Sequence, residues 1–457
     1  MNKKTTIDGP IYDARQLGTP KMLLLGLQHM FAMFGATVLV PALTGLDVAT
    51  ALLFAGIGTL LFHLLTGGKV PAFLGSSFAF IGGYNAIRTI GAAADGSPIY
   101  DNALLPYACF GVLIAGLMYV VLSVLFKTFG VKKVMRFFPP IVTGPIIIAI
   151  GLNLSSSAIN NCSQNWWIAL AAIVIIIAAN IWGKGMVKII PILLGVIGSY
   201  LIAVIADANV RNTLIQNVND AKWFALPIYR DETVFGLFLN GNVDGGKLLT
   251  AVITIVPLSL ATMVEHIGDI SAISSTCNRN YIEDPGLHRT LMGDGLATTL
   301  AALFGAPANT TYGENTGVLA LSRVYDPKVI RLAAVYAVIL SFSPKFDALV
   351  NSIPTAIIGG VSFILYGMIS AVGVRNVVEN KVDLTKSRNL IIAAVIFVCG
   401  LGFSGGVSFQ VGNATVTLTS LAIAALAGVL LNAILPGNDY EFGTDVKGDS
   451  AANLGTY

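Results

Sequence analysis

The sequence has 457 residues, of which 55% are apolar and only 11% are charged, and its formal net charge is +3. Soluble domains carry about 25% charged residues, so this composition excludes an ordinary soluble protein. The small net charge and the scattered basic residues argue against a nucleic-acid-binding surface. The four cysteines, at positions 109, 162, 277 and 399, have no spacing typical of a metal or redox site.

Apolar runs of about 20 residues recur from Lys21 almost to the carboxyl end, and each could cross a hydrocarbon core of about 30 Å. They predict an all-α polytopic membrane protein. The fourteen predicted spans lie at 22–45, 49–66, 71–90, 104–126, 135–151, 165–183, 186–206, 248–268, 288–305, 309–323, 329–343, 352–373, 389–404 and 413–436. The third and tenth are weaker, because they are short or interrupted by polar residues and glycine.

An even number of spans places both termini on the same side of the membrane. Assigning both to the cytoplasm puts most of the 27 basic residues inside, as the positive-inside rule requires. Four exceptions share one long outer loop, where the rule is weak: Arg211, Lys222, Arg230 and Lys247. We therefore predict cytoplasmic termini.

Fourteen spans divide into two halves of seven, and an odd number per half makes the halves insert in opposite orientations. The third predicted span of each half is interrupted, by Gly75-Ser76-Ser77-Phe78 in the first and by residues 309–315 (NTTYGEN) in the second. Paired interrupted spans are typical of the binding site of a transporter. The alternative, ordinary kinked segments without a ligand, stays open at this point.

Three acidic residues in or beside predicted spans stand out. Glu265 and Asp269 lie near the end of the eighth, and Glu314 lies in the interrupted tenth. A charge in mid-bilayer costs about 2.5–3.5 kcal/mol, so such residues indicate function. Glu265 and Asp269 are four apart and share a helix face, where two carboxylates cannot both ionise easily. This suits a proton-coupled carrier, although Asp269 could instead be solvated at the cytoplasmic interface.

The same interruptions carry two aromatic side chains, Phe78 and Tyr312, that could stack on a flat ligand. Aromatic faces beside carboxylates suit a small, planar, neutral molecule with ring N–H groups, such as a nucleobase, and suit an anion poorly. His29 and His266 also lie in predicted spans, either as buried core histidines or as proton relays.

Two enzyme-like patterns fail on inspection. Residues 241–247 have phosphate-loop spacing, but Leu248 replaces the required Ser or Thr. Residues 402–406 (GFSGG) fit a nucleophile elbow, yet no histidine follows position 288. We predict no enzyme, no cofactor and no metal site.

Four segments carry a resemblance to a known family: 28–41 (QHMFAMFGATVLVP), 74–80 (LGSSFAF), 284–289 (DPGLHR) and 309–315 (NTTYGEN). The chain resembles the nucleobase–ascorbate transporter family over nearly its whole length. The block 311–315 (TYGEN) is similar to the bacterial uracil branch in particular.

This resemblance implies a core domain, 1–127 and 248–345, and a gate domain, 128–247 and 346–457. Short extended segments would lead into the third and tenth spans. By position, Glu265 and Glu314 match carboxylates that bind the pyrimidine ring, and Phe78 matches a stacking aromatic. The remaining implied or candidate site residues are Ala36 and Gly313 as backbone contacts, Ser77 and Tyr312 at the interruptions, and His29, Asp269 and Tyr366 with Glu265 in protonation.

The resemblance further implies uracil import with a proton, a bacterial inner membrane and a homodimer formed through the gate domain. One departure is that Asp269 occupies a position where the uracil–proton symporter of this branch has a histidine. Sodium coupling is therefore not excluded. Two alternatives also remain, a xanthine or other purine carrier of the same family and an anion carrier of related architecture.

Overall fold

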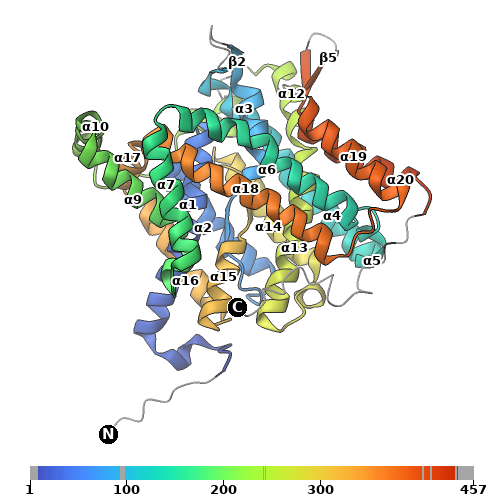
Figure 1. Ribbon diagram of the computed structural model, residues 1–457, viewed down its shortest axis with the longest axis horizontal. Helices are drawn as coiled ribbons and strands as arrows, with labels where there is room; N and C mark the ends of the chain where they lie inside the picture. Colours follow the sequence, from blue (N-terminus) through green and yellow to red (C-terminus); the bar gives the residue numbers. More distant parts are fainter. Residues whose placement is uncertain are drawn as a thin grey trace.

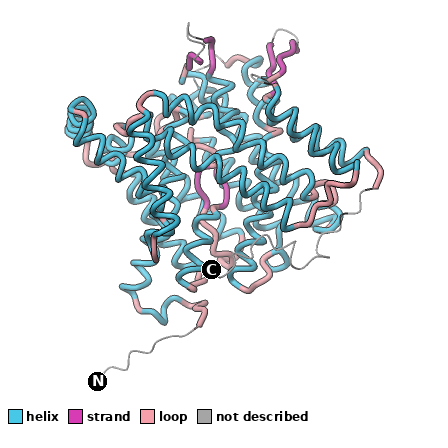
Figure 2. Tube along the Cα trace, viewed as in Figure 1, coloured by secondary structure: helices cyan, strands magenta, loops and turns pink. Residues whose placement is uncertain are grey.

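The computed structural model describes residues 9–92, 98–239, 241, 243–403, 406–411, 414–437 and 440. Residues 1–8 and 441–457, which contain both chain ends, lie outside the described part, so the predicted side of the termini is not tested. Helices make up most of the described chain (Figures 1 and 2), and this confirms the predicted all-α class.

The elements of the first half are α1 (Thr19–Thr44), α2 (Val48–Leu65), β1 (Leu74–Ser76), α3 (Ile81–Arg88), β2 (Thr89–Ala92), β3 (Pro98–Tyr100), α4 (Leu105–Phe129), α5 (Val131–Met135), α6 (Pro140–Ser163), α7 (Trp166–Trp182), α8 (Met186–Ile189), α9 (Pro191–Ala206), α10 (Ala208–Asp220) and α11 (Val234–Leu239). Those of the second half are α12 (Gly245–Ile255), α13 (Leu258–Cys277), α14 (Leu287–Leu303), β4 (Asn309–Thr311), α15 (Gly313–Ser322), α16 (Pro327–Ser341), α17 (Pro344–Asn351), α18 (Thr355–Glu379), α19 (Ser387–Gly402), β5 (Val407–Val411), β6 (Ala414–Leu418) and α20 (Ser420–Ile434). Every predicted span overlaps at least one of these helices.

Length and composition identify six helices among the described residues that could cross a membrane, or up to eight if each of two bent pairs is one span. The bent pairs are α9 with α10 and α16 with α17. Helices α7, α19 and α20 are apolar but shorter. The chain is thus a multi-pass membrane protein, while the number fourteen stays a prediction.

Helix ends follow local sequence signals. Gly45 ends α1 in the left-handed region at φ 78°, which glycine adopts without a steric penalty. Asp47 then caps α2, because its side chain accepts a hydrogen bond from the backbone N–H of Thr50. Asp326 caps α16 in the same way, followed by Pro327 in its first turn. Short turns of this kind reverse the chain between consecutive membrane helices.

The packing of the helices is symmetric between the two halves. Helix α6 packs along its counterpart α18, α2 packs on α14, and β1 pairs with β4. The pair α4–α14 has its counterpart in α2–α16, α7–α9 in α19–α20, and α1–α16 in α4–α12. Each contact recurs when the halves are exchanged, as expected for an inverted repeat. Domain boundaries within this arrangement remain predictions.

Helix α13 ends later in the chain than the sequence predicts. The predicted eighth span stops at 268, but α13 continues to Cys277 and ends at Asn278, whose φ is 51°. The extra turns are polar, and their hydroxyls bond back to main-chain carbonyls, as Ser271 does to Ile267 at 2.8 Å. Glu265 and Asp269 therefore lie well inside the helix, and the predicted position near its end is wrong.

Candidate functional site

Two short strands cross at the centre of the helices, drawn in magenta in Figure 2. Strands β1 and β4 are antiparallel, with Leu74 opposite Thr311, Gly75 opposite Thr310 and Ser76 opposite Asn309. Backbone N–H and C=O groups cannot be left unpaired in a membrane interior, and here the two interrupted segments pair with each other. Each strand leads into a short helix, β1 into α3 and β4 into α15. The matched interruptions of the sequence meet in space.

Tyr312 braces this crossing. Its ring is 4% exposed, and its hydroxyl donates to the Ser76 carbonyl at 2.8 Å and accepts from Thr37 of α1 at 3.3 Å. A Cβ added to Gly75 would lie 2.5 Å from the Tyr312 ring. Glycine is therefore required where the ring crosses β1. The aromatic ring predicted to stack on a ligand is packed against the main chain of β1.

The three carboxylates come from two neighbouring helices. Glu265 and Asp269 lie on one face of α13, and Glu314 lies in the first turn of α15, which packs against α13. Glu265 and Asp269 each lie close enough to Glu314 to interact with it electrostatically. All three side chains are partly accessible although their helices are mostly buried. The structure thus brings together the acidic groups that the sequence separates by about fifty positions.

Small residues leave room beside these carboxylates. A Cβ added to Gly313 or Gly317 of α15, or to Gly268 of α13, would meet no atom within 4 Å. Ala36 of α1 is buried, and so is Ser77, whose hydroxyl has no hydrogen-bond partner among the described residues. Space is therefore open beside these glycines of the two acidic helices.

Phe78 and Tyr366 lie together at the junction of the predicted domains. Phe78 opens the short turn between β1 and α3, and its ring is partly accessible. It meets the buried ring of Tyr366 of α18 edge to face, with the centroids 6.4 Å apart. Tyr366, from the other half of the chain, therefore helps to orient the Phe78 ring.

His29 is buried in α1 and contacts α15. The side-chain amide of Asn315 donates to the His29 carbonyl at 3.0 Å and lies 3.2 Å from Nδ1 of its ring. Asn315 directly follows Glu314, so His29 ties α1 to the first turn of the acidic helix. Asn315 was not among the predicted site residues, although its polar side chain in an interrupted span was a signal.

Two further polar groups escaped the sequence analysis. Thr311 of β4 donates to Oδ2 of Asp269 at 2.7 Å, which joins α13 to the strand crossing. Asp294 of α14 lies with Oδ2 2.9 Å from Nδ1 of His266, and both side chains are fully buried. An aspartate in the predicted span 288–305 was the available signal for this second pair.

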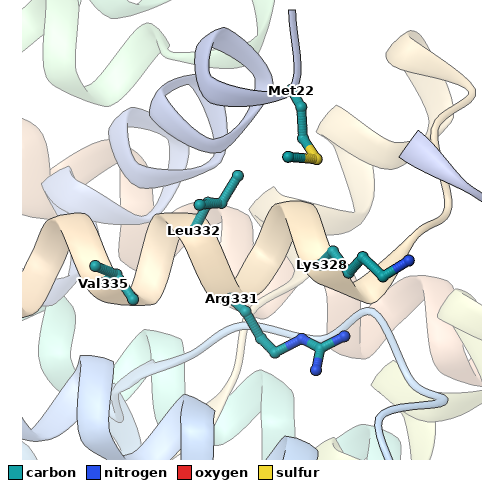
Figure 3. Close-up of a pocket in the computed structure, with 5 residues that line it drawn as sticks. All are labelled: Met22, Lys328, Arg331, Leu332 and Val335. Carbon is teal, nitrogen blue, oxygen red and sulfur yellow. The ribbon is translucent and has the colours of Figure 1, made fainter. Parts of the chain in front are cut away.

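A hollow in the surface lies elsewhere. It has a cavity volume of about 230 Å³ and is lined by Met22, Lys328, Arg331, Leu332 and Val335 (Figure 3). It contains none of the predicted site residues. The carboxylates and glycines of α13 and α15 are a better match for a polar ligand.

Comparisons with known proteins agree with this geometry. The family model Xan_ur_permease, described as a permease family, matches residues 20–408. A curated uracil permease of Bacillus subtilis (strain 168) is 40% identical over 436 residues, covering 92% of this chain and 94% of its own. The uracil permease of Escherichia coli (strain K12) is 37% identical over 422 residues, covering 90% of each chain.

Solved structures show the same fold at low identity. The transmembrane domain of the cyanobacterial bicarbonate transporter BicA matches with a TM-score of 0.58 at 13% identity, covering 93% of this chain and 99% of that one. Murine Slc26a9, an anion transporter captured in its inward-facing state, matches with a TM-score of 0.61 at 11% identity, covering 94% and 73%. At such identity the likeness concerns architecture alone.

Proposed function

The chain belongs to this permease family, and from that premise we propose that it imports uracil across the bacterial inner membrane together with a proton. Its family and its uracil permease relatives make it a nucleobase transporter and not an enzyme. The choice of uracil, the coupling ion and the direction of transport are the parts that we propose.

The observation that carries the proposal is the convergence of α13 and α15 at the strand crossing. Glu265 and Glu314 lie within electrostatic range of each other beside open space. A pyrimidine ring has N–H groups that carboxylates accept and carbonyls that a protonated carboxyl can bind. We assign Glu265 and Glu314 to the ring edge and Phe78 to its face.

Small groups complete the proposed site. The exposed backbone at Gly313 begins α15, so the N–H groups of this half-helix and its positive dipole end point at the ligand carbonyls. Ala36 closes the opposite side, and the free hydroxyl of Ser77 is available to the ligand. Tyr312 supports the site by holding β1 in place.

Coupling follows from the cost of burying charge. Glu265 binds a ring carbonyl only when it carries a proton, and three nearby carboxylates in a low-dielectric site favour at least one proton. Release of that proton to the cytoplasm removes the donor and loosens the ligand. Asp269, His29 and Tyr366 surround this step and are proposed to tune it.

The alternatives fit less well. A bicarbonate or other anion carrier shares the architecture, but acidic side chains repel an anion where this chain has Glu265 and Glu314. A xanthine carrier would share most of the site, whereas the similar relatives described above are named uracil permeases. The homodimer through the gate domain and the cytoplasmic termini remain parts of the proposal, and sodium is the alternative coupling ion.

Uptake of labelled uracil into proteoliposomes tests the function. We expect accumulation when the outside is acidic and little without a pH gradient, with unlabelled uracil competing better than xanthine. A sodium gradient in the absence of a pH gradient tests the other coupling ion. Failure to accumulate uracil under any of these gradients would contradict the proposal.

A further inference from the structure

The segment before the first membrane helix is hydrogen-bonded to the far end of the acidic helix α15. Ile11 pairs in parallel with Val324. The Ile11 N–H donates to the Arg323 carbonyl at 2.8 Å, and the Tyr325 N–H donates to the Ile11 carbonyl at 2.7 Å. Arg323 directly follows α15. We call residues Ile11–Leu17 the N-terminal clasp.

Tyr12 of the clasp reaches the end of the other acidic helix. Its hydroxyl donates to the carbonyl of Cys277, the last residue of α13, at 2.9 Å. The Arg279 guanidinium lies 4.3 Å from the centre of the Tyr12 ring, and the Tyr325 ring lies 5.5 Å from it. One side chain thus contacts residues at the ends of both α13 and α15.

The clasp is held firmly in this position. The Ala14 N–H donates to Oδ2 of Asp326 at 2.8 Å, in a buried contact. Ile11 and Ala14 pack with Val324 and Val329 in a small apolar cluster. Since residue 11 bonds partners more than three hundred positions away, the clasp joins the first half of the chain to the second.

We propose that Tyr12 is a positioning residue that sets the separation of the carboxylates on α13 and α15. Glu265 and Asp269 lie on the first helix and Glu314 on the second. Helix α15 has 10 residues and spans about 15 Å, so a shift of its clasped end moves Glu314 at its other end. The inference rests on the proposed function, because it assigns the clasp to the same substrate site.

Tyr12→Ala tests the clasp through a split between KM and maximal rate. The substitution removes the hydrogen bond to Cys277 and the ring contacts to Arg279 and Tyr325, while the main-chain bonds of Ile11 remain. We expect the KM for uracil to rise by about threefold to tenfold, with the maximal rate changed less than about twofold. Tyr12→Phe keeps the ring contacts to Arg279 and Tyr325 and should restore most of the affinity. Tyr336 supplies a matched control, because its hydroxyl donates to the Leu23 carbonyl of α1 at 3.3 Å.

Hydrogen exchange gives a readout that does not depend on the substrate. We expect faster exchange of the α15 amides, 313–322, in Tyr12→Ala and not in Tyr336→Ala. Unchanged α15 exchange, or an equal rise in KM in Tyr336→Ala, overturns the proposal. If Tyr12→Ala does not fold, Tyr12→Leu, which removes the ring and the hydroxyl but keeps an apolar side chain, is measured against the same criteria. If the wild type does not carry uracil while Tyr12→Ala still speeds exchange of the α15 amides, the proposed function is contradicted and the structural role of the clasp is supported.

Discussion

Thr311 donates a hydrogen bond of 2.7 Å to Asp269, and this bond joins the strand crossing to the acidic face of α13. Asp269 is a position where, by the resemblance described above, the chain departs from the uracil branch, which has a histidine there. The departing side chain is therefore anchored by the motif segment 309–315 itself. This relationship makes the local chemistry of Asp269 testable.

Thr311→Val removes the hydroxyl and keeps the shape of the side chain. An intramolecular hydrogen bond contributes about 0.5–1.5 kcal/mol, so we expect uracil uptake at a fixed subsaturating concentration to fall by about twofold to tenfold. Thr311→Ser keeps the donor and serves as the control. Equal uptake by the valine and serine variants would show that the hydrogen bond to Asp269 does not contribute to uracil transport.

Glu265→Gln removes the exchangeable proton and keeps a hydrogen-bonding side chain. We expect the variant to retain binding of uracil, measured by thermal shift or calorimetry, while its uptake no longer responds to an imposed pH gradient. Wild-type protein in the same vesicles is the reference. A variant whose uptake keeps its normal pH dependence would remove Glu265 from the coupling step.

Gly75→Ala introduces a methyl group 2.5 Å from the Tyr312 ring and 2.7 Å from the Thr37 hydroxyl. Overpacking of this kind costs about 1–3 kcal/mol, and we expect a lower unfolding temperature in detergent together with reduced uptake. Gly82→Ala, in the adjacent α3, meets no atom within 4 Å and is the control. Equal unfolding temperatures for the two variants would refute the brace that we assign to Tyr312.

Asp294→Ala leaves His266 without its partner in a fully buried position. Leaving one partner of a buried polar contact unsatisfied costs about 1–3 kcal/mol, so we expect destabilisation in denaturation measured by tryptophan fluorescence. Asp294→Asn keeps an acceptor for the imidazole and should lose less. If both variants unfold like the wild type, the 2.9 Å contact contributes nothing to stability.

Asp347, in the first turn of α17 and outside the predicted spans, gives a pH prediction. Burial, with a smaller contribution from the nearby charge of Asp47, raises the pKa of Asp347 to about 6 from 3.8. The folded protein therefore retains a proton that the unfolded chain releases, and stability falls as the pH rises from about 4 to about 6.

Asp347→Asn removes this titration. Relative to the variant, the wild type should lose on the order of 1–2 kcal/mol across that window, allowing for its partial exposure. Thermal unfolding at pH 4, 5, 6 and 7 measures the difference. Parallel stability curves for the two proteins would contradict the raised pKa of Asp347.

Much of the fold was readable in the sequence because the bilayer imposes a simple rule. An apolar run of about 20 residues must be a helix, and the polar interruptions at 75–78 and 309–315 cannot face lipid. The position of Glu265 within its helix was not readable, because the hydroxyl-rich turns to Cys277 look like a span end. They continue as helix through side-chain bonds to the main chain.

The sequence by itself determined that the chain is a membrane protein, that two interrupted segments correspond, and which carboxylates and aromatics stand near them. These follow from local hydropathy and from motifs that lie within single segments. The tertiary structure alone decided that Thr311 holds Asp269, that Tyr312 braces β1, that Asp294 pairs with His266, and that Tyr12 joins the ends of α13 and α15. Three of these contacts join residues from different elements whose spacing along the chain carries no periodic signal, and the fourth, between Tyr312 and Ser76, depends on how the two strands cross.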